Sequence, residues 1–291
     1  MKRIHVFLAV ATMAVISTGM FSSCKKDGVY NPKKKISRVF SQYSGGGKNL
    51  ESTWTWDKNK LSKIDYGGGY FAVFDYDKNQ VSKITYSDGD YITFSYDGSK
   101  INKMEFFYNG KLDAMLKFEH SGSKITKVTE EEYYYDYYDD DDYSYAMKEN
   151  KKNQVLSLIL PVSMSENGKE ANLKSHKKVR KANGTDTYTY KYTWKGNNVE
   201  KMDGEYIYDG GVYTFTYKYT YDKNNNPLCG FLDEQEMSKN NVTKLTFTNS
   251  EGDYSEAEYS YVYDGKFPIE SREMYRSGNY SYTTTMYYEY E

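Results

Sequence analysis

The sequence predicts an all-β fold built as an antiparallel meander of repeated β-hairpins, and three observations support this. Near copies of one motif recur, each beginning twenty residues after the last: WDKNKLSKI at 56–64, YDKNQVSKI at 76–84 and YDGSKINKM at 96–104. Residues that favour strands are abundant, with 35 Tyr and 13 Phe against 4 Pro among 291 residues. Long stretches also alternate between aromatic and polar residues, which is the period of a strand.

Each copy of the motif predicts one hairpin. The stretch 91–96 alternates, so that Ile92, Phe94 and Tyr96 share one face of a strand. Asp97-Gly98 then signals a tight turn, since a glycine accepts a positive φ without steric cost. Extended structure resumes at Ile101. One copy therefore corresponds to two antiparallel strands and the turn between them.

Weaker copies carry the same pattern to the end of the chain, at 120–128, 194–202 and 237–245, after an entry copy at 33–39. We expect roughly 16–19 strands, with a helix only in the N-terminal signal. A meander of this length must cover its aromatic face and its strand edges. Curling into a barrel does both, whereas a wrapped open sheet or two stacked sheets would leave edges exposed.

The repeat, written Y-D-x-x-(G/N)-x-(I/L/V)-x-K-(I/M/L), resembles the tyrosine-aspartate repeats of secreted bacterial shell proteins. It is still more similar to a family of bacterial lipoproteins of unknown function that have a porin-like β fold. This resemblance covers roughly residues 30–291 and implies a porin-like β-barrel. The family brings no established activity and no catalytic residues that could be carried over to this chain.

The N-terminus resembles a bacterial lipoprotein signal peptide. A basic start is followed by a short apolar run, Ile4–Ile16, and then by FSSC, in which Cys24 stands at the lipidation position. Phe and Ser replace the usual Leu and the usual Gly or Ala of that signal. An ordinary secretory signal that happens to contain a cysteine is the alternative.

This resemblance implies a domain organisation and a location. Residues 1–23 would be removed, Cys24 would carry the lipid, 24–32 would form an anchor linker, and 33–291 would form a single β domain. The protein would be anchored in the cell envelope, at the outer membrane, facing either the periplasm or the cell surface. Lipidation would leave Cys229 without a partner, so we expect Cys229 to be a small core residue.

The β domain itself is expected to be water-soluble. Lys63, Lys83 and Lys103 recur in the middle of strands, and each would cost about 2–4 kcal/mol if it faced lipid near the midplane of a bilayer. Several strands are also shorter than the ~9–11 residues that a membrane-spanning strand needs. The formal net charge of −2 does not favour a nucleic-acid partner.

Two irregular excursions interrupt the repeats, an acidic one near 130–145 and a basic one near 163–186. The acidic excursion offers hard oxygen ligands for a cation, but its spacing does not match a calcium loop. A solvated acidic loop is the simpler interpretation. The basic excursion is interpreted as a long connection between hairpins, with a polyanion site as the alternative.

The sequence contains no motif that indicates catalysis, a metal centre or a cofactor. His120 replaces the aromatic residue of the repeat, which favours a structural role. We therefore expect a protein that is not an enzyme and has no cofactor. A glycoside hydrolase needs only two carboxylates and stays as the least favoured alternative.

Trp54 and Trp56 are the candidate binding residues, because aromatic rings stack on sugar rings and the two lie on one face of a strand. The alternative is that alternating aromatic residues form the core of the sheet. We expect a binding or scaffolding role with a glycan as the ligand. The second hypothesis is an accessory subunit that contacts a protein partner in an outer-membrane complex.

Overall fold

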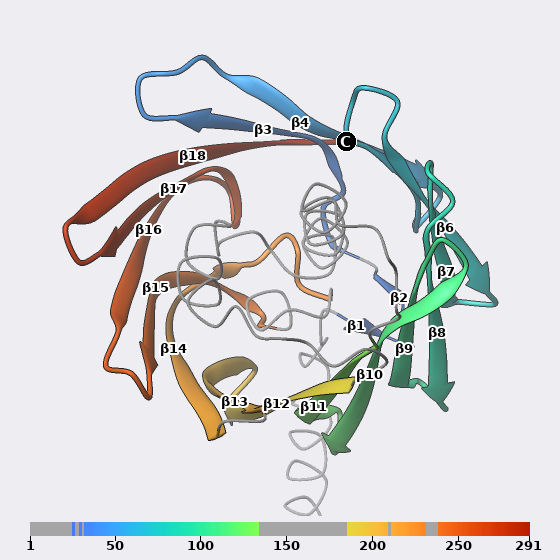
Figure 1. The fold of residues 1–291 in the computed structure, drawn as a ribbon. Coiled ribbons are helices and arrows are strands. Elements are labelled where there is room, and N and C mark those ends of the chain that lie inside the picture. The colour runs from blue at the N-terminus through green and yellow to red at the C-terminus, as the bar shows by residue number, and fades with distance from the viewer. Residues whose placement is uncertain (1–24, 27–28, 31, 134–184, 209–210, 231–237) are drawn as a thin grey trace, which may run out of the picture.

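The computed structural model describes residues 25–26, 29–30, 32–133, 185–208, 211–230 and 238–291. Sixteen antiparallel strands form a closed barrel in which each strand pairs with the next and β18 pairs with β3 (Figure 1). A separate pair, β1 (Lys25–Lys26) and β2 (Val29–Tyr30), lies in the expected anchor linker. The predicted all-β meander is confirmed, and the choice between barrel and open sheet is settled in favour of the barrel.

The barrel strands are short in the first half of the chain and longer in the second. They are β3 (Ile36–Tyr43), β4 (Asn49–Asp57), β5 (Lys60–Asp65), β6 (Phe71–Asp77), β7 (Gln80–Tyr86), β8 (Tyr91–Asp97), β9 (Lys100–Tyr108), β10 (Lys111–Ser121), β11 (Lys124–Tyr133), β12 (Thr185–Lys195), β13 (Asn198–Tyr208), β14 (Gly211–Asn225), β15 (Asn240–Asn249), β16 (Tyr254–Asp264), β17 (Phe267–Ser277) and β18 (Tyr280–Tyr290). The described residues include no apolar helix of membrane-spanning length.

The three clearest copies of the motif are the hairpins β4–β5, β6–β7 and β8–β9. Their turns lie at one end of the barrel, which we call the repeat rim. The alternate connections, such as residues 66–70 between β5 and β6, lie at the other end, the far rim. One twenty-residue copy is therefore one hairpin, as predicted.

A β-bulge in each repeat explains the spacing of its apolar residues. In β4–β5, Trp56 pairs with Leu61 and Thr55 pairs with Lys63, so Ser62 is an extra residue without a cross-strand position. Strict alternation would place Leu61 and Ile64 on opposite faces, but the bulge turns both toward the inside of the barrel, where both are fully buried. The Ser of Leu-Ser-Lys-Ile is thus the bulged residue.

The polar tip of the repeat's aromatic residue joins each hairpin to the one before it. Tyr76 Oη donates a hydrogen bond to the carbonyl of Leu61 at 2.9 Å, and Tyr96 Oη donates to the carbonyl of Val81 at 2.9 Å. Equivalent bonds lead around the barrel: Trp56 Nε1 to Ile36, His120 Nε2 to Ile101, Trp194 Nε1 to Ile125, and the hydroxyls of Tyr221 to Val199, Tyr261 to Val242 and Tyr290 to Pro268. We call these eight bonds the latch ring.

The latch ring gives the repeated aromatic residue its physical role. Each acceptor is the carbonyl of the apolar residue just before the bulge, so donor and acceptor recur once per hairpin. Because Tyr290 bonds to β17 and Trp56 bonds to β3, the ring continues across the junction where the chain closes the barrel. The expected structural role of His120 is consistent with its place in this ring.

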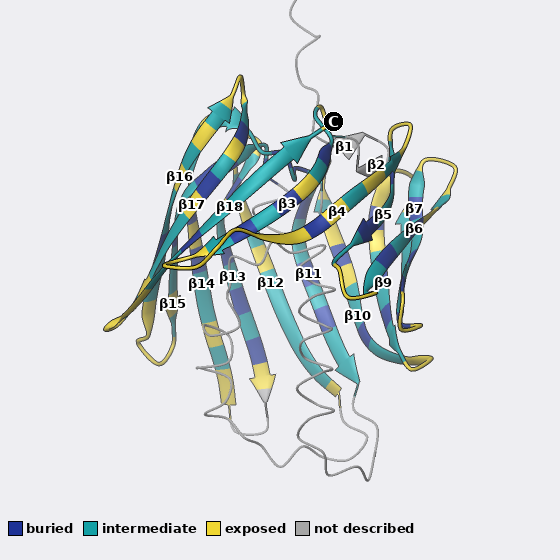
Figure 2. Ribbon diagram, turned by 90° about the horizontal axis from the view of Figure 1, so that it is seen from above, coloured by how far each residue is buried: buried dark blue, intermediate teal, exposed yellow. Residues whose placement is uncertain are grey.

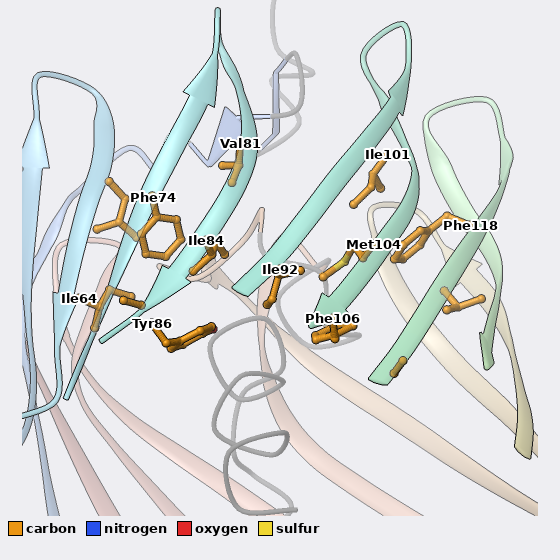
Figure 3. Packing of buried hydrophobic residues seen from close by; sticks show 14 of the residues in the cluster. Ile64, Phe74, Val81, Ile84, Tyr86, Ile92, Ile101, Met104, Phe106 and Phe118 are labelled. Carbon is orange, nitrogen blue, oxygen red and sulfur yellow. The ribbon is translucent and has the colours of Figure 1, made fainter. Parts of the chain in front are cut away.

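The buried apolar side chains lie on one face of the sheet, which is the inside of the barrel. Figure 2 shows buried and exposed positions alternating along the strands. Figure 3 shows the largest cluster, in which Ile84, Ile92 and Met104 pack side by side across neighbouring strands. A second cluster forms around Met202, Tyr217 and Leu245. Burial of these faces stabilises the barrel by roughly 25 cal/mol per Å² of apolar surface.

The structure also bears on the expectations for Cys229 and for the two irregular excursions. Cys229 is buried, as expected for a small core residue. Residues 130–133 of the expected acidic excursion belong to β11, and residues 185–186 of the basic one belong to β12. The rest of both excursions, the signal segment 1–23 and Cys24 lie outside the described residues.

Candidate functional site

The two faces of the barrel wall differ in chemistry, and the outer face carries ion pairs. Lys103 bonds Glu105 at 2.9 Å on β9, and Lys201 bonds Asp203 at 2.6 Å on β13. On β15–β17, Glu256 lies between Lys244 at 2.8 Å and Arg276 at 3.0 Å, and these contacts lower its pKa to about 2. Lysines of the repeat therefore point away from the barrel interior and are neutralised by neighbouring carboxylates.

The inner face is lined by aromatic rings whose hydroxyls meet carboxylates. Tyr190 Oη donates to the buried carboxylate of Glu130 at 2.8 Å, and burial with that nearby charge raises the pKa of Tyr190. Tyr206 Oη donates to Asp186 at 2.9 Å. These pairs come from β11, β12 and β13, so three adjacent strands present hydroxyls and carboxylates to the same side of the wall.

A glycine permits this aromatic lining to pack closely. Phe215 lies directly opposite Gly204 in the β13–β14 pair, and its ring covers the glycine so closely that an added Cβ would lie 2.1 Å from the ring. The same ring meets Tyr190 edge-on at 6.2 Å between centroids. Gly204 thus makes room for an aromatic contact between strands that are not neighbours.

Glu273 is a buried carboxyl on the inner face of β17. Its Oε1 accepts a hydrogen bond from Tyr259 Oη at 3.2 Å, and its cross-strand neighbours are Tyr259 on β16 and Thr284 on β18. Burial raises its pKa to about 7, and the bond from Tyr259 offsets only part of that shift. A carboxyl whose pKa is raised this far by burial is a candidate for a functional group.

The predicted residues Trp54 and Trp56 also lie on the inner face. Their rings are 6.4 Å apart and tilted by 30°, and both pack partly buried against the larger apolar cluster. Trp54 Nε1 donates to Ser52 Oγ at 2.9 Å, whereas Trp56 Nε1 belongs to the latch ring. Trp54 therefore faces the inside of the barrel, and Trp56 also has a structural role through its bond to Ile36.

Three tyrosines at the far rim form a cluster that the sequence did not single out. Tyr66 and Tyr70 flank the turn between β5 and β6, with ring centroids 5.7 Å apart. Tyr70 stacks on Tyr86 at 6.0 Å with an angle of 17° between the planes. The sequence contains these two residues as YGGGY at 66–70, a pattern that by itself indicates only a turn.

Clusters of carboxylate side chains are potential metal sites. Within the described ranges, no group of three or more His, Cys, Asp and Glu side chains is arranged to hold a metal ion. The acidic excursion considered as a cation site lies mostly outside those ranges.

Comparison with known proteins shows the fold. No protein-family model matches the chain, and no curated protein matches it. Among solved structures, a porin-like protein from Bacteroides vulgatus superimposes with a TM-score of 0.53 at 10% identity, covering 89% of this chain and 99% of that one. A porin-like protein from Bacteroides uniformis superimposes with a TM-score of 0.50 at 11% identity, covering 91% and 100%. The expected porin-like β-barrel fold is confirmed.

Proposed function

We propose that this is a lipid-anchored protein of the cell envelope, held at the outer membrane, whose barrel stands in water and binds a glycan without catalysing a reaction. The division of the wall into two faces carries the proposal. The outer face bears ion pairs such as Lys103–Glu105, and charged residues facing lipid near the bilayer midplane would each cost about 2–4 kcal/mol. The inner face bears aromatic rings, hydroxyls and carboxyls, which are the groups that recognise sugars.

The proposed anchor, Cys24, precedes the barrel by a short linker. Strand β2 of that linker contacts β5, and Figure 2 places β1, β2 and the C-terminus at the same end of the barrel. That end is the repeat rim, so an anchor there would leave the far rim pointing away from the membrane. With two cysteines in the chain, a lipid thioether at Cys24 and an intrachain disulfide at Cys229 exclude each other.

The anchor is tested by intact-mass and peptide mass spectrometry of the processed protein, with a Cys24→Ala variant as control. A new N-terminus at residue 24 carrying acyl chains would support the proposal. A chain that keeps a free N-terminal amine and unmodified cysteine thiols, or a Cys24–Cys229 disulfide, would contradict lipidation.

Glycan binding is tested by the retardation of the processed protein in gels that contain laminarin, mannan, xylan or dextran, together with Trp fluorescence. Trp54→Ala should weaken binding, because that ring lies on the inner face and is only partly buried against the larger apolar cluster. Trp194→Ala, which removes a ring from the latch ring on the opposite part of the wall, is the matched control. No retardation by any of the four polysaccharides would contradict the glycan proposal.

A protein partner is the second candidate, and one surface feature favours it. Ile207 and Val212 pair across β13–β14 on the outer face and are 56% and 53% exposed. If this pair contacts a subunit of an outer-membrane complex, Ile207→Lys should abolish crosslinking to that subunit in intact cells. Sugar release from a bound polysaccharide would instead favour the hydrolase alternative.

A further inference from the structure

The tyrosine cluster at the far rim contains two buried hydroxyls that have no hydrogen-bond partner. The Oη atoms of Tyr66 and Tyr86 are both inaccessible to solvent and unsatisfied. Burial raises the pKa of both groups well above the ordinary value, and in Tyr86 the neighbouring Tyr66 and Tyr70 raise it further. The three phenols are thus close enough to influence one another.

Unsatisfied hydroxyls are costly, and two in one cluster need an explanation. Leaving a buried donor without a partner costs about 1–3 kcal/mol, and phenylalanine would provide the same ring without that cost. The latch tyrosines show the usual arrangement in this barrel, since Tyr76 and Tyr96 each donate to a backbone carbonyl. Tyr66 and Tyr86 depart from that arrangement, which is expected where a bound molecule supplies the partner.

The surroundings of the cluster define the chemistry of that molecule. Stacked and tilted rings offer apolar faces, and the hydroxyls of Tyr66 and Tyr86 offer hydrogen bonds at their edges. Asp88 and Asp90 are close enough to raise the pKa of Tyr70, so an anionic group would be repelled. An uncharged ring that carries several hydroxyls satisfies all three conditions.

We propose that Tyr66, Tyr70 and Tyr86 form a subsite for a neutral sugar ring at the far rim of the barrel. This proposal rests on the proposed glycan binding and names both the residues and the charge class of the sugar. The sugar would stack on a tyrosine ring, and it would bond to the hydroxyls of Tyr66 and Tyr86 only after these rings move, because both Oη atoms are inaccessible in the present arrangement. Acidic sugars would be excluded by Asp88 and Asp90.

The backbone and the position of the cluster suit such a subsite. Tyr66 and Tyr70 are joined by Gly67, Gly68 and Gly69, all at positive φ, and an added Cβ at any of these glycines would meet nothing within 4 Å. All three lie in a backbone region that side chains rarely adopt, so the turn that joins the two rings requires glycine. The far rim is also the end opposite the linker, so a large glycan would approach it without meeting the membrane.

The test compares two double variants of the processed full-length protein. Tyr66→Phe/Tyr86→Phe removes the two unpartnered hydroxyls and keeps the rings, whereas Tyr76→Phe/Tyr96→Phe removes two latch hydroxyls of the same wall. Affinity is measured for neutral laminarin and mannan and for acidic polygalacturonate, and stability is measured by urea unfolding.

The two variants should behave in opposite ways. Tyr66→Phe/Tyr86→Phe should weaken binding of a neutral polysaccharide about tenfold or more while its unfolding midpoint stays or rises, because an unsatisfied buried donor is removed. Tyr76→Phe/Tyr96→Phe should lose stability and keep its affinity. Polygalacturonate should not bind.

Four results would overturn the subsite. Unchanged affinity of Tyr66→Phe/Tyr86→Phe for a polysaccharide that the wild type binds would remove these residues from the site. A loss of stability in that variant would show that its hydroxyls have structural partners. Tighter binding of polygalacturonate than of neutral glycans would refute the charge argument. If the wild type binds no polysaccharide at all, the glycan function itself fails, and the subsite fails with it.

Discussion

Replacing Tyr76 and Tyr96 together by Phe should destabilise the barrel through the loss of two latch bonds. Each hydroxyl donates to a backbone carbonyl of the preceding hairpin at 2.9 Å. Burial raises the pKa of Tyr76 to about 12, which shows that its hydroxyl is largely removed from water. A hydrogen bond of this kind contributes about 1 kcal/mol net, so the pair should cost about 2 kcal/mol.

Urea unfolding followed by Trp fluorescence measures this loss. With a slope of about 3 kcal/mol per molar urea, 2 kcal/mol corresponds to a midpoint lowered by about 0.7 M. Tyr66→Phe/Tyr86→Phe is the control, since it removes the same number of hydroxyls from the same part of the wall, the connection before β6 and the end of β7, without breaking a hydrogen bond. Equal midpoints for the two double variants would refute the idea that the repeated aromatic residue acts as a latch.

Two other perturbations test the inner wall. Glu273→Gln should stabilise the protein at pH 8 by about 2–3 kcal/mol and change little at pH 4, because burial raises the pKa of Glu273 from 4.5 to about 7. Folding then favours the protonated carboxyl, so the contribution of Glu273 to wild-type stability is largest below about pH 4.5 and is lost as the pH rises through 7. If urea unfolding showed the same pH dependence for the wild type and Glu273→Gln, the raised pKa of Glu273 would be excluded. Gly204→Ala should lower the free energy of unfolding by about 1–3 kcal/mol, because an added Cβ would lie 2.1 Å from the Phe215 ring. Phe215→Leu in the same chain should recover part of that loss. Additive losses of the two substitutions in a double-mutant cycle would contradict this contact.

Much of the fold could be predicted from the sequence because its signals are local. Alternation in 91–96 and the Asp97-Gly98 turn concern neighbours in the chain, and both became β8 and the turn to β9 as expected. The bulge within Leu61-Ser62-Lys63-Ile64 was not predicted. Two apolar residues that are three positions apart, such as Leu61 and Ile64, are compatible with several local structures. Only pairing with Trp56 on β4 shows that Ser62 is the extra residue.

The candidate site depended on tertiary structure to a greater extent. The sequence singled out Trp54 and Trp56 by their spacing, and they do share one face, but it could not show that this face is the inside of the barrel. Tyr66 and Tyr70 belong to the connection between β5 and β6, and Tyr86 is the last residue of β7. Their meeting therefore depends on the register of β6 with its neighbours. Whether a tyrosine hydroxyl finds a partner cannot be read from its place in the chain.

The sequence by itself determined the strands and the hairpins, because periodicity and turn chemistry act within about twenty residues. The tertiary structure alone decided that the meander closes, since closure joins β18 to β3 across nearly the whole length of the chain. It also decided which aromatic residues complete the latch ring and which keep unsatisfied hydroxyls. Hydrogen-bond partners in a barrel belong to neighbouring hairpins, and their distances are fixed only once every strand has its register.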